Sequence, residues 1–363
     1  MSGLSRRPRL LDRGGKTPID LFGVVIGKPA PFHRQEAPAP EAAALPAVLE
    51  RDELRLDEWN SLRSILRRNS RRRARQITEL ALNLPGLIAL GARIHRAGFG
   101  YAACCQPALV FKYVGQYLGK SFDTAARLRI MSHHYRTLAA RLPDLCKLGF
   151  PRNEIVVWSH RVELDTFTIG LCMPATQYLE GDLSLVFSVN GVRLHKLSFT
   201  CIPGKEAGLE AGTALLVGGS QGFPGTSALI RQASKAIGEI SPAAMLILGL
   251  QALAEHLGAD AILGVTADEQ TSNTLPANPE HAISRYDSLW EMSGGERHGR
   301  FYRLPGRVAW KDSSHLSNGH RSRARRKREL KERILVQIRQ SAERLFAVAD
   351  RLHVVLLVAI SIA

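Results

Sequence analysis

The chain lacks the features that would assign a reaction directly. Its five cysteines are an odd number with no C-x-x-C spacing, which disfavours both a disulfide framework and a zinc site. No H-E-x-x-H, Walker A or Ser/His/Asp order occurs in it, and this disfavours protease, hydrolase and NTPase chemistry. We therefore predict a cytoplasmic protein with reduced thiols and no metal site.

Long apolar runs are also missing. The first fifteen residues, MSGLSRRPRLLDRGG, carry charges but not the apolar core of a signal peptide. The run at the other end, residues 352–363, is only a dozen residues long, whereas a membrane-spanning helix needs roughly 20. We predict no transmembrane helix and interpret this run as a packed strand or helix end. Transient contact with a membrane is the alternative.

Acidic residues are fewer than basic residues. The chain has 33 Asp and Glu against 49 Lys and Arg, a formal net charge of +16. Seven arginines fall within residues 63–75, and eight basic residues within 321–333 (RSRARRKRELKER). This balance indicates an anionic partner, such as lipid headgroups, nucleic acid or the phosphates of coenzyme A. The alternative is a soluble protein of arginine-rich composition whose charged faces are simply solvated.

Four regions follow from composition and periodicity. Residues 1–50 hold seven of the eighteen prolines and are predicted to be a disordered leader, dispensable for folding. Residues 51–150 have helical periodicity, residues 151–310 predict a mixed-sheet α/β domain, and residues 311–363 predict a basic segment, a C-terminal helix and the apolar tail. The fold class is α+β.

The helical region has two clear features. Pro85-Gly86 is expected to separate a helix over residues 77–84 from one over 87–95. A longer helix is predicted over residues 123–142 and contains His133 and His134. Adjacent helical residues point about 100° apart, so these two cannot jointly chelate a metal, and one of them is expected in the core.

The best hairpin signal is Asn190-Gly191 between two alternating apolar runs, residues 183–189 and 192–199. A slip in the second run predicts a bulge at His195-Lys196. Two strands are predicted before the hairpin, over residues 154–160 and 162–171, so that an antiparallel meander forms.

A parallel βαβ unit is predicted next. Apolar runs at residues 214–217 and 261–265 are separated by far more than the dozen residues that a crossover needs. Ser241 and Pro242 predict the start of a buried helix, and Gly258 predicts its end. A short helix over residues 283–292 and a last strand over residues 299–304 complete the domain.

Several boxes of the chain resemble the VirK/YbjX family of proteobacterial proteins. They are the GG-x-QG motif at residues 218–222, the helix 230–238, the box YDSLWE at residues 286–291 with Gly294-Gly295, the closing residues 302–305, and upstream Tyr117-Leu118, Arg127, His134-Tyr135 and Leu138. The similarity covers about residues 85–340. It implies a setting in cell-envelope integrity, stress response or virulence, without an established activity, and a place in the cytoplasm or at the inner membrane.

One box departs from that pattern. After the strand at residues 261–265, family members carry a polar box with a histidine and a tyrosine. Here residues 266–271 read TADEQT. The departure implies that an activity residing in this box of the relatives is altered or lost.

The predicted order of elements also resembles the architecture of GNAT acyltransferases. That resemblance implies splayed central parallel strands with acyl-CoA between them and its pyrophosphate at a helix N-terminus. The corresponding candidate cofactor-binding residues are Gln221, Gly222, Gly225, Thr226, Ser227 and Arg231. Two glycines permit close backbone approach, and free N–H groups at a helix start attract anions. A tight structural turn is the alternative.

Asp268 and Glu269 are candidates for a general base, because they follow the second parallel strand, at the edge where open α/β sheets place their ligand sites. Solvated loop carboxylates are the alternative. Two classes of function stay open: a non-enzymatic envelope-supporting factor that binds anionic lipid or nucleic acid, and an acyl-CoA-dependent transferase.

Overall fold

The computed structural model describes residues 78, 81–106, 108–142, 154–174, 179–271, 279–307 and 318–362. The chain divides into two compact units, Met1–Asp52 and Glu53–Ala363, and every described residue belongs to the second. The predicted leader over residues 1–50 and the arginine-rich segment 63–75 lie outside the described residues.

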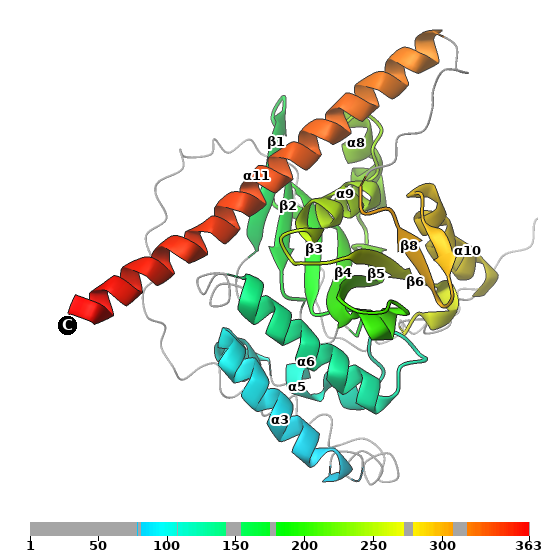
Figure 1. The fold of residues 1–363 in the computed structure, drawn as a ribbon. Helices are drawn as coiled ribbons and strands as arrows, with labels where there is room; N and C mark the ends of the chain where they lie inside the picture. Colours follow the sequence, from blue (N-terminus) through cyan, green and yellow to red (C-terminus); the bar gives the residue numbers. More distant parts are fainter. Residues whose placement is uncertain are drawn as a thin grey trace, which may run out of the picture. The chain divides into compact units, whose positions relative to one another are not determined.

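The second unit is built on one eight-stranded sheet with the order β1-β2-β3-β4-β5-β6-β8-β7 (Figure 1). Only β5 and β6 run parallel, and every other neighbouring pair is antiparallel. The strands are β1 (Ile155–Val162), β2 (Asp165–Cys172), β3 (Leu183–Val189), β4 (Val192–Pro203), β5 (Thr213–Gly222), β6 (Ala261–Val265), β7 (Glu296–His298) and β8 (Phe301–Leu304). The predicted α+β class, with a meander joined to a βαβ unit, is confirmed.

The hairpin between β3 and β4 forms at the predicted turn. Asn190 and Gly191 both have positive φ, 51° and 79°, as a type I′ turn requires. The predicted position of the bulge is wrong by one residue. Phe187 pairs with His195 and Ser188 with Arg193, so the extra residue on β4 is Leu194, whose side chain is buried. Burial of that leucine, and not the slip in alternation, sets the register.

The crossover between β5 and β6 contains α8 (Ser227–Ala236) and α9 (Pro242–Ala254). As predicted, the Ser241 hydroxyl caps α9 by accepting from Ala244 N, and Gly258 adopts a positive φ just after it. Helix α9 packs on β3 and β4, where Gly249 lies against Leu185 and Ile169. The apolar sequence of α9 follows from this burial, because the helix is covered again from outside.

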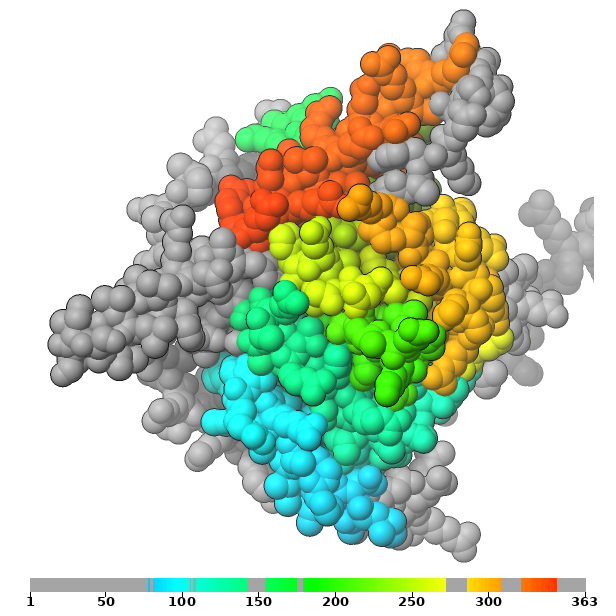
Figure 2. All heavy atoms as spheres, in the orientation of Figure 1, coloured from blue at the N-terminus to red at the C-terminus, as the bar shows by residue number. Residues whose placement is uncertain are grey.

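That outer cover is α11 (Asn318–Ile362), which packs on α9 and β1. Figure 2 shows its described side chains, in orange, lying against the yellow-green surface of α9. Ile334, Leu335, Ile338 and Ala342 are buried among its described side chains. Gln337 Oε1 accepts a 2.9 Å hydrogen bond from Trp158 Nε1 of β1. The backbone of α11 continues as helix through the apolar tail. Among the described residues, no helix combines the length and the apolar character that a membrane crossing requires.

The helical region before the sheet consists of α3 (Leu84–Ile94), α4 (Gly100–Cys105), α5 (Ala108–Phe111) and α6 (Thr124–Arg141), with short helical turns at His95–Phe99 and Lys112–Val114. The predicted break between two helical stretches is present, but it lies at Asn83 and not at Pro85-Gly86: residues 81–82 are helical, Asn83 is a turn, and α3 begins at Leu84. Pro85 lies in the first turn of α3, where its missing N–H costs nothing because that donor has no intrahelical partner. Helix α6 matches its prediction, is capped by Asp123, and packs on β4.

Candidate functional site: the gap between β5 and β6

The two parallel strands separate near their carboxyl ends. They pair from Ala214 with Ala261 to Val217 with Gly264, but β5 runs on to Gly222 while β6 ends at Val265. A bulge in the β4–β5 pairing leaves Gly218 as the extra residue. Because a bulge bends its strand, β5 leaves β6 at Gly218 and follows β4 alone. The pairing of the two strands therefore ends at Val217 and Gly264.

The segment Leu179–Asp182 lies against the bulge. A Cβ atom at Gly218 would collide with the carbonyl oxygen of Glu180, and one at Gly219 would collide with its carboxylate. The paired glycines of the GG-x-QG motif are therefore required by the close approach of Glu180, whose side chain is buried.

A polar cluster fills this part of the gap. Gln221 Nε2 donates a hydrogen bond to Glu180 Oε1. The backbone N–H of Ser220 donates to the hydroxyl oxygen of Tyr286 at 3.4 Å. Burial, and next the negative charge of Glu180, raise the pKa of Tyr286 to about 12. The phenol therefore keeps its proton at neutral pH, and since its oxygen accepts from Ser220, that proton can be donated elsewhere.

Gln270 adds a buried amide to the cluster. Its side chain is fully buried and close enough to Tyr286 to lower the pKa of the phenol. The amide acts on the phenol as a hydrogen-bonding neighbour, so it belongs to the same buried cluster.

Helix α10 (Pro279–Met292) closes the β6 side of the gap. Trp290 is fully buried, donates from Nε1 to Val265 O at 2.8 Å, and lies 2.6 Å from where a Cβ of Gly264 would be. Asp287 Oδ1 accepts from Ala267 N at 2.9 Å. The GG-x-QG motif and the YDSLWE box, which are more than sixty residues apart in the sequence, thus meet at the same gap.

The predicted cofactor-binding residues lie at the outer end of β5. Gly225 has a φ of 76° with open space around it, and Ser227 and Arg231 are exposed on α8. Thr226 is buried and donates to Phe223 O and Leu194 O instead of capping α8. The first turn of α8 consequently has no side-chain cap.

The two candidate bases differ in their surroundings. Glu269 Oε2 accepts from both Ser121 N, at 3.0 Å, and Ser121 Oγ, at 2.7 Å, so this carboxylate anchors the loop before α6. Asp268 is exposed. Among the described residues, no hydrogen bond joins Asp268 or Glu269 to Tyr286. Glu180, the carboxylate that does lie in the gap, was missed because a single Glu in the turn before a hairpin carries no sequence signal.

A buried charge network holds the segment that carries Glu180. Lys112 Nζ donates to Gly181 O and Asp182 Oδ1, each at 3.3 Å, and the Tyr117 hydroxyl donates to Asp182 Oδ2. Burial alone would raise the pKa of Asp182, but the Lys112 charge, the nearby His134 and the hydrogen bonds hold it below its usual range. Glu180 is therefore positioned by the ion pair two residues away.

The histidine of α6 that was expected in the core is His134. It is fully buried, its Nδ1 accepts from Cys201 N at 3.1 Å, and burial lowers its pKa to about 4. His133 is partly exposed, and its Nε2 lies 3.0 Å from Thr213 Oγ1. The thiols of Cys172 and Cys201 are free, and burial raises their pKa values to about 11 and about 12.

Together these features define an α+β protein whose largely antiparallel sheet contains, among its described strands, the parallel pair β5 and β6. The family model for DUF535, described as a protein of unknown function, matches residues 67–340. The chain belongs to this family, which confirms the resemblance to VirK/YbjX proteins.

Two proteins that are similar in sequence carry no activity in their names. An uncharacterized protein of Haemophilus influenzae is 24% identical over 225 residues, covering 61% of this chain and 73% of that protein. The uncharacterized protein YbjX of Escherichia coli is 25% identical over 247 residues, covering 64% and 72%. Among solved structures, a mutant of a cAMP-binding acyltransferase from Mycobacterium smegmatis matches with 13% identity and a TM-score of 0.23. That match covers 63% of this chain and 65% of the other, just under two thirds of its length.

Proposed function

We propose that this protein transfers an acyl group from a coenzyme A thioester, bound in the gap between β5 and β6, to an amine or hydroxyl acceptor. The observation that carries the proposal is the divergence of the parallel pair at Gly218, with Glu180 and Tyr286 beside the diverging strand. Beyond Gly218 the edge of β5 no longer pairs with β6, and backbone groups there other than the Ser220 N–H could pair with the amides of the pantetheine arm. The uncapped first turn of α8 offers N–H groups to the pyrophosphate.

The two ionisable side chains supply acid–base chemistry in this proposal. Glu180 accepts the proton of the attacking amine or hydroxyl as the nucleophile bonds to the thioester carbonyl carbon. The C–S bond then breaks, Tyr286 donates a hydrogen bond to the departing thiolate, and the proton that Glu180 has taken up neutralises it. Because the pKa of Tyr286 is raised to about 12, the phenol stays protonated and acts as a hydrogen-bond donor. In this proposal Gln221 positions the Glu180 carboxylate, and Arg231 positions the phosphates of coenzyme A.

Replacing Ser227 with glutamate tests the cofactor site without straining the backbone, unlike a valine at Gly225, where φ is 76°. Ser227 is exposed at the first position of α8. A negative charge there stabilises the helix by about 0.3–1 kcal/mol but repels a pyrophosphate. We expect acetyl-CoA affinity, measured by calorimetry, to fall about ten-fold or more, a loss of about 1.4 kcal/mol.

Ser227→Gln is the matched control and is expected to bind like the wild type. Thermal unfolding of both variants verifies that the fold is intact. Wild-type protein that gives no heat with acetyl-CoA or with a long-chain acyl-CoA would exclude the transferase proposal, and the splay would then be a structural feature.

A second function, binding to an anionic surface, is supported by α11. Its basic segment, residues 321–333, is mostly exposed. Arg325 and Arg328 form ion pairs with Glu329 and Glu332 one turn away, and the remaining positive charge exceeds these two carboxylates. Contact with lipid headgroups at the inner membrane would suit a cytoplasmic protein that supports the envelope under stress or in virulence, and nucleic acid is the other polyanion.

Charge reversal at Arg323, Arg325 and Arg326 tests this second function. Each basic residue near an anionic surface contributes about 1 kcal/mol, so the triple variant should lose retention on anionic vesicles or on DNA. Reversal of three exposed basic residues elsewhere, Arg161, Lys205 and Arg303, is the control. Retention by the triple variant equal to that of the wild type, or retention that does not respond to salt, would contradict an electrostatic contact.

A further inference from the structure

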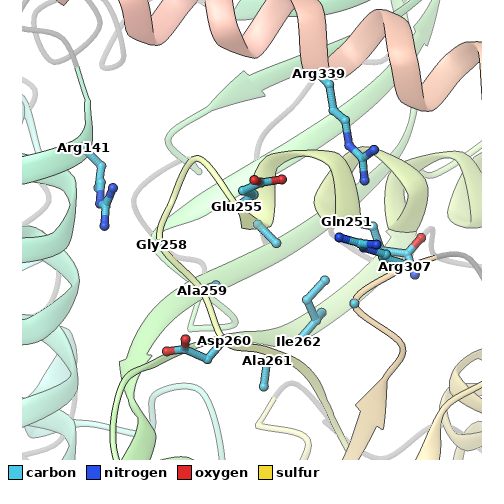
Figure 3. Close-up of a pocket in the computed structure, with 12 residues that line it drawn as sticks. Arg141, Gln251, Glu255, Gly258, Ala259, Asp260, Ala261, Ile262, Arg307 and Arg339 are labelled. Carbon is cyan, nitrogen blue, oxygen red and sulfur yellow. The ribbon is translucent and has the colours of Figure 1, made fainter.

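A second polar site lies at the opposite end of β6 from the gap. A cavity of about 620 Å³ opens beside Ala261 and Ile262, the first residues of that strand. This volume lies within the range of about 300–1,000 Å³ that is usual for small-molecule sites. Its polar lining comes from Arg141, Gln251, Glu255, Asp260, Arg307 and Arg339 (Figure 3).

The three arginines come from separate parts of the fold. Arg141 is the last residue of α6, Arg307 follows β8, and Arg339 belongs to α11. Figure 3 shows their side chains around the same cavity, with those of Arg307 and Arg339 on one side and that of Arg141 across from them. Three elements that are distant in sequence thus each contribute one guanidinium.

These guanidinium groups are not neutralised within the described part of the chain, where no ion pair joins any of the three to a carboxylate. The Nε of Arg339 is buried and has no hydrogen-bond partner there. A buried donor without a partner is costly. An anion that enters the cavity would supply the missing acceptor.

The carboxylates of the lining do not fill that need. Asp260 Oδ2 accepts from the backbone N–H of Thr213 at 2.9 Å, so this group holds the start of β5 next to the start of β6. Glu255 and Asp260 are both exposed. Arg141 and Arg307 are exposed as well, and three guanidiniums against two carboxylates leave a net positive lining.

The chain around each arginine is held in position, while the side chains of Arg141 and Arg307 are exposed. Gln251 Nε2 donates to Pro305 O at 2.8 Å, which fixes the segment leading to Arg307 on α9. The guanidinium of Arg141 lies against the backbone of Gly258, where a Cβ would be only 2.7 Å from its Nη2. Arg339 follows the fully buried Ile338. Such preorganisation lowers the entropy cost of binding.

We propose that this cavity binds a small phosphate monoester, with Arg141, Arg307 and Arg339 contacting the phosphate group. Planar guanidinium groups make paired hydrogen bonds to phosphate oxygens, and three of them match the multiple oxygens and double charge of a monoester. The remaining volume accommodates the organic part of the ligand, whose hydroxyl groups can donate to Glu255. The bound anion would fasten α6, the segment after β8 and α11 together.

Glycerol 3-phosphate is the probe that tests this site, with inorganic phosphate as the smaller one. We expect either to raise the melting temperature of the wild-type protein, by about 5 °C when the ligand exceeds its Kd a hundred-fold. Sodium chloride of the same ionic strength should give no such shift. Arg339→Met should weaken binding about ten-fold or more, as expected for loss of a charge-assisted hydrogen bond.

Arg333→Met is the matched control, because Arg333 is an exposed arginine of the same helix outside the cavity. It should keep the shift. Arg141→Met, on a different element, should lose it, and this variant decides the question if Arg339→Met does not fold. Equal shifts in all of these variants, or no shift in the wild type, would overturn the proposal.

Two sources offer the same phosphate chemistry: a soluble metabolite and the headgroup of phosphatidate. Sedimentation with vesicles of phosphatidate in phosphatidylcholine separates them. Binding to these vesicles that Arg339→Met abolishes supports the headgroup. Vesicle binding that Arg339→Met leaves unchanged, together with the shift by glycerol 3-phosphate, supports the soluble ligand. Neither readout involves acyl transfer, so the outcome is independent of the function proposed for the gap.

Discussion

Replacing Lys112 with methionine is expected to lower the free energy of unfolding by about 3–5 kcal/mol. Lys112 and Asp182 are both buried and lie 3.3 Å apart. Removing the ammonium group leaves the Asp182 carboxylate buried beside uncharged hydroxyl donors, among them those of Tyr117 and Thr200. Urea unfolding followed by circular dichroism measures the loss.

Two further variants make this prediction specific. Lys205→Met removes an exposed lysine and should change stability by less than about 0.5 kcal/mol. The double variant Lys112→Met with Asp182→Leu should recover much of the loss, because a buried pair replaced by apolar groups is often neutral. A loss below about 1 kcal/mol in Lys112→Met would contradict the buried charge network. Because this network positions Glu180, the single variant should also weaken any acyl-CoA binding.

Trp290→Ala is expected to destabilise the protein by about 3–5 kcal/mol, the usual cost of removing a buried tryptophan. The side chain is fully buried, packs over Gly264, and donates to the carbonyl oxygen of Val265. Its loss would leave a cavity against β6 and an unpaired buried acceptor. Since α10 also carries Tyr286, displacement of this helix should move the phenol away from Glu180.

Trp290→Phe is the comparison that separates these effects. It keeps most of the apolar volume and removes the hydrogen bond, so the expected loss is smaller than that of the alanine variant. Chemical unfolding with tryptophan-independent detection, by far-ultraviolet circular dichroism, gives both values. An alanine variant as stable as the wild type would show that Trp290 does not hold α10 on β6.

Local signals predicted the fold where they agreed with tertiary packing. Asn190-Gly191 fixed the hairpin because both residues tolerate positive φ. Ser241, Pro242 and Gly258 bounded the crossover helix through capping that needs no distant partner. The bulge was misplaced because burial of Leu194 outweighed the alternation pattern. The start of α3 at Leu84 was misplaced because Pro85 is tolerated in a first helical turn.

The candidate site was predicted only in part. The GG-x-QG motif identified β5 and its loop, yet the reason for the glycines is the contact with Glu180, forty residues earlier. Hydrophobic periodicity in the sequence cannot indicate a contact between residues so far apart. The arginines of the second cavity are equally separated, and Arg141, Arg307 and Arg339 meet only because α11 packs across α9. Short strand β7 was missed, since three residues give no alternation.

The binding of coenzyme A in the gap is tested most directly by amide hydrogen exchange, with and without acetyl-CoA. The account predicts that added ligand slows exchange along residues 218–229, the free edge of β5 and the first turn of α8. The same experiment on Ser227→Glu should show little protection. Protection confined to other segments, or none at a saturating ligand concentration, would contradict the central claim that the splayed strands bind an acyl donor.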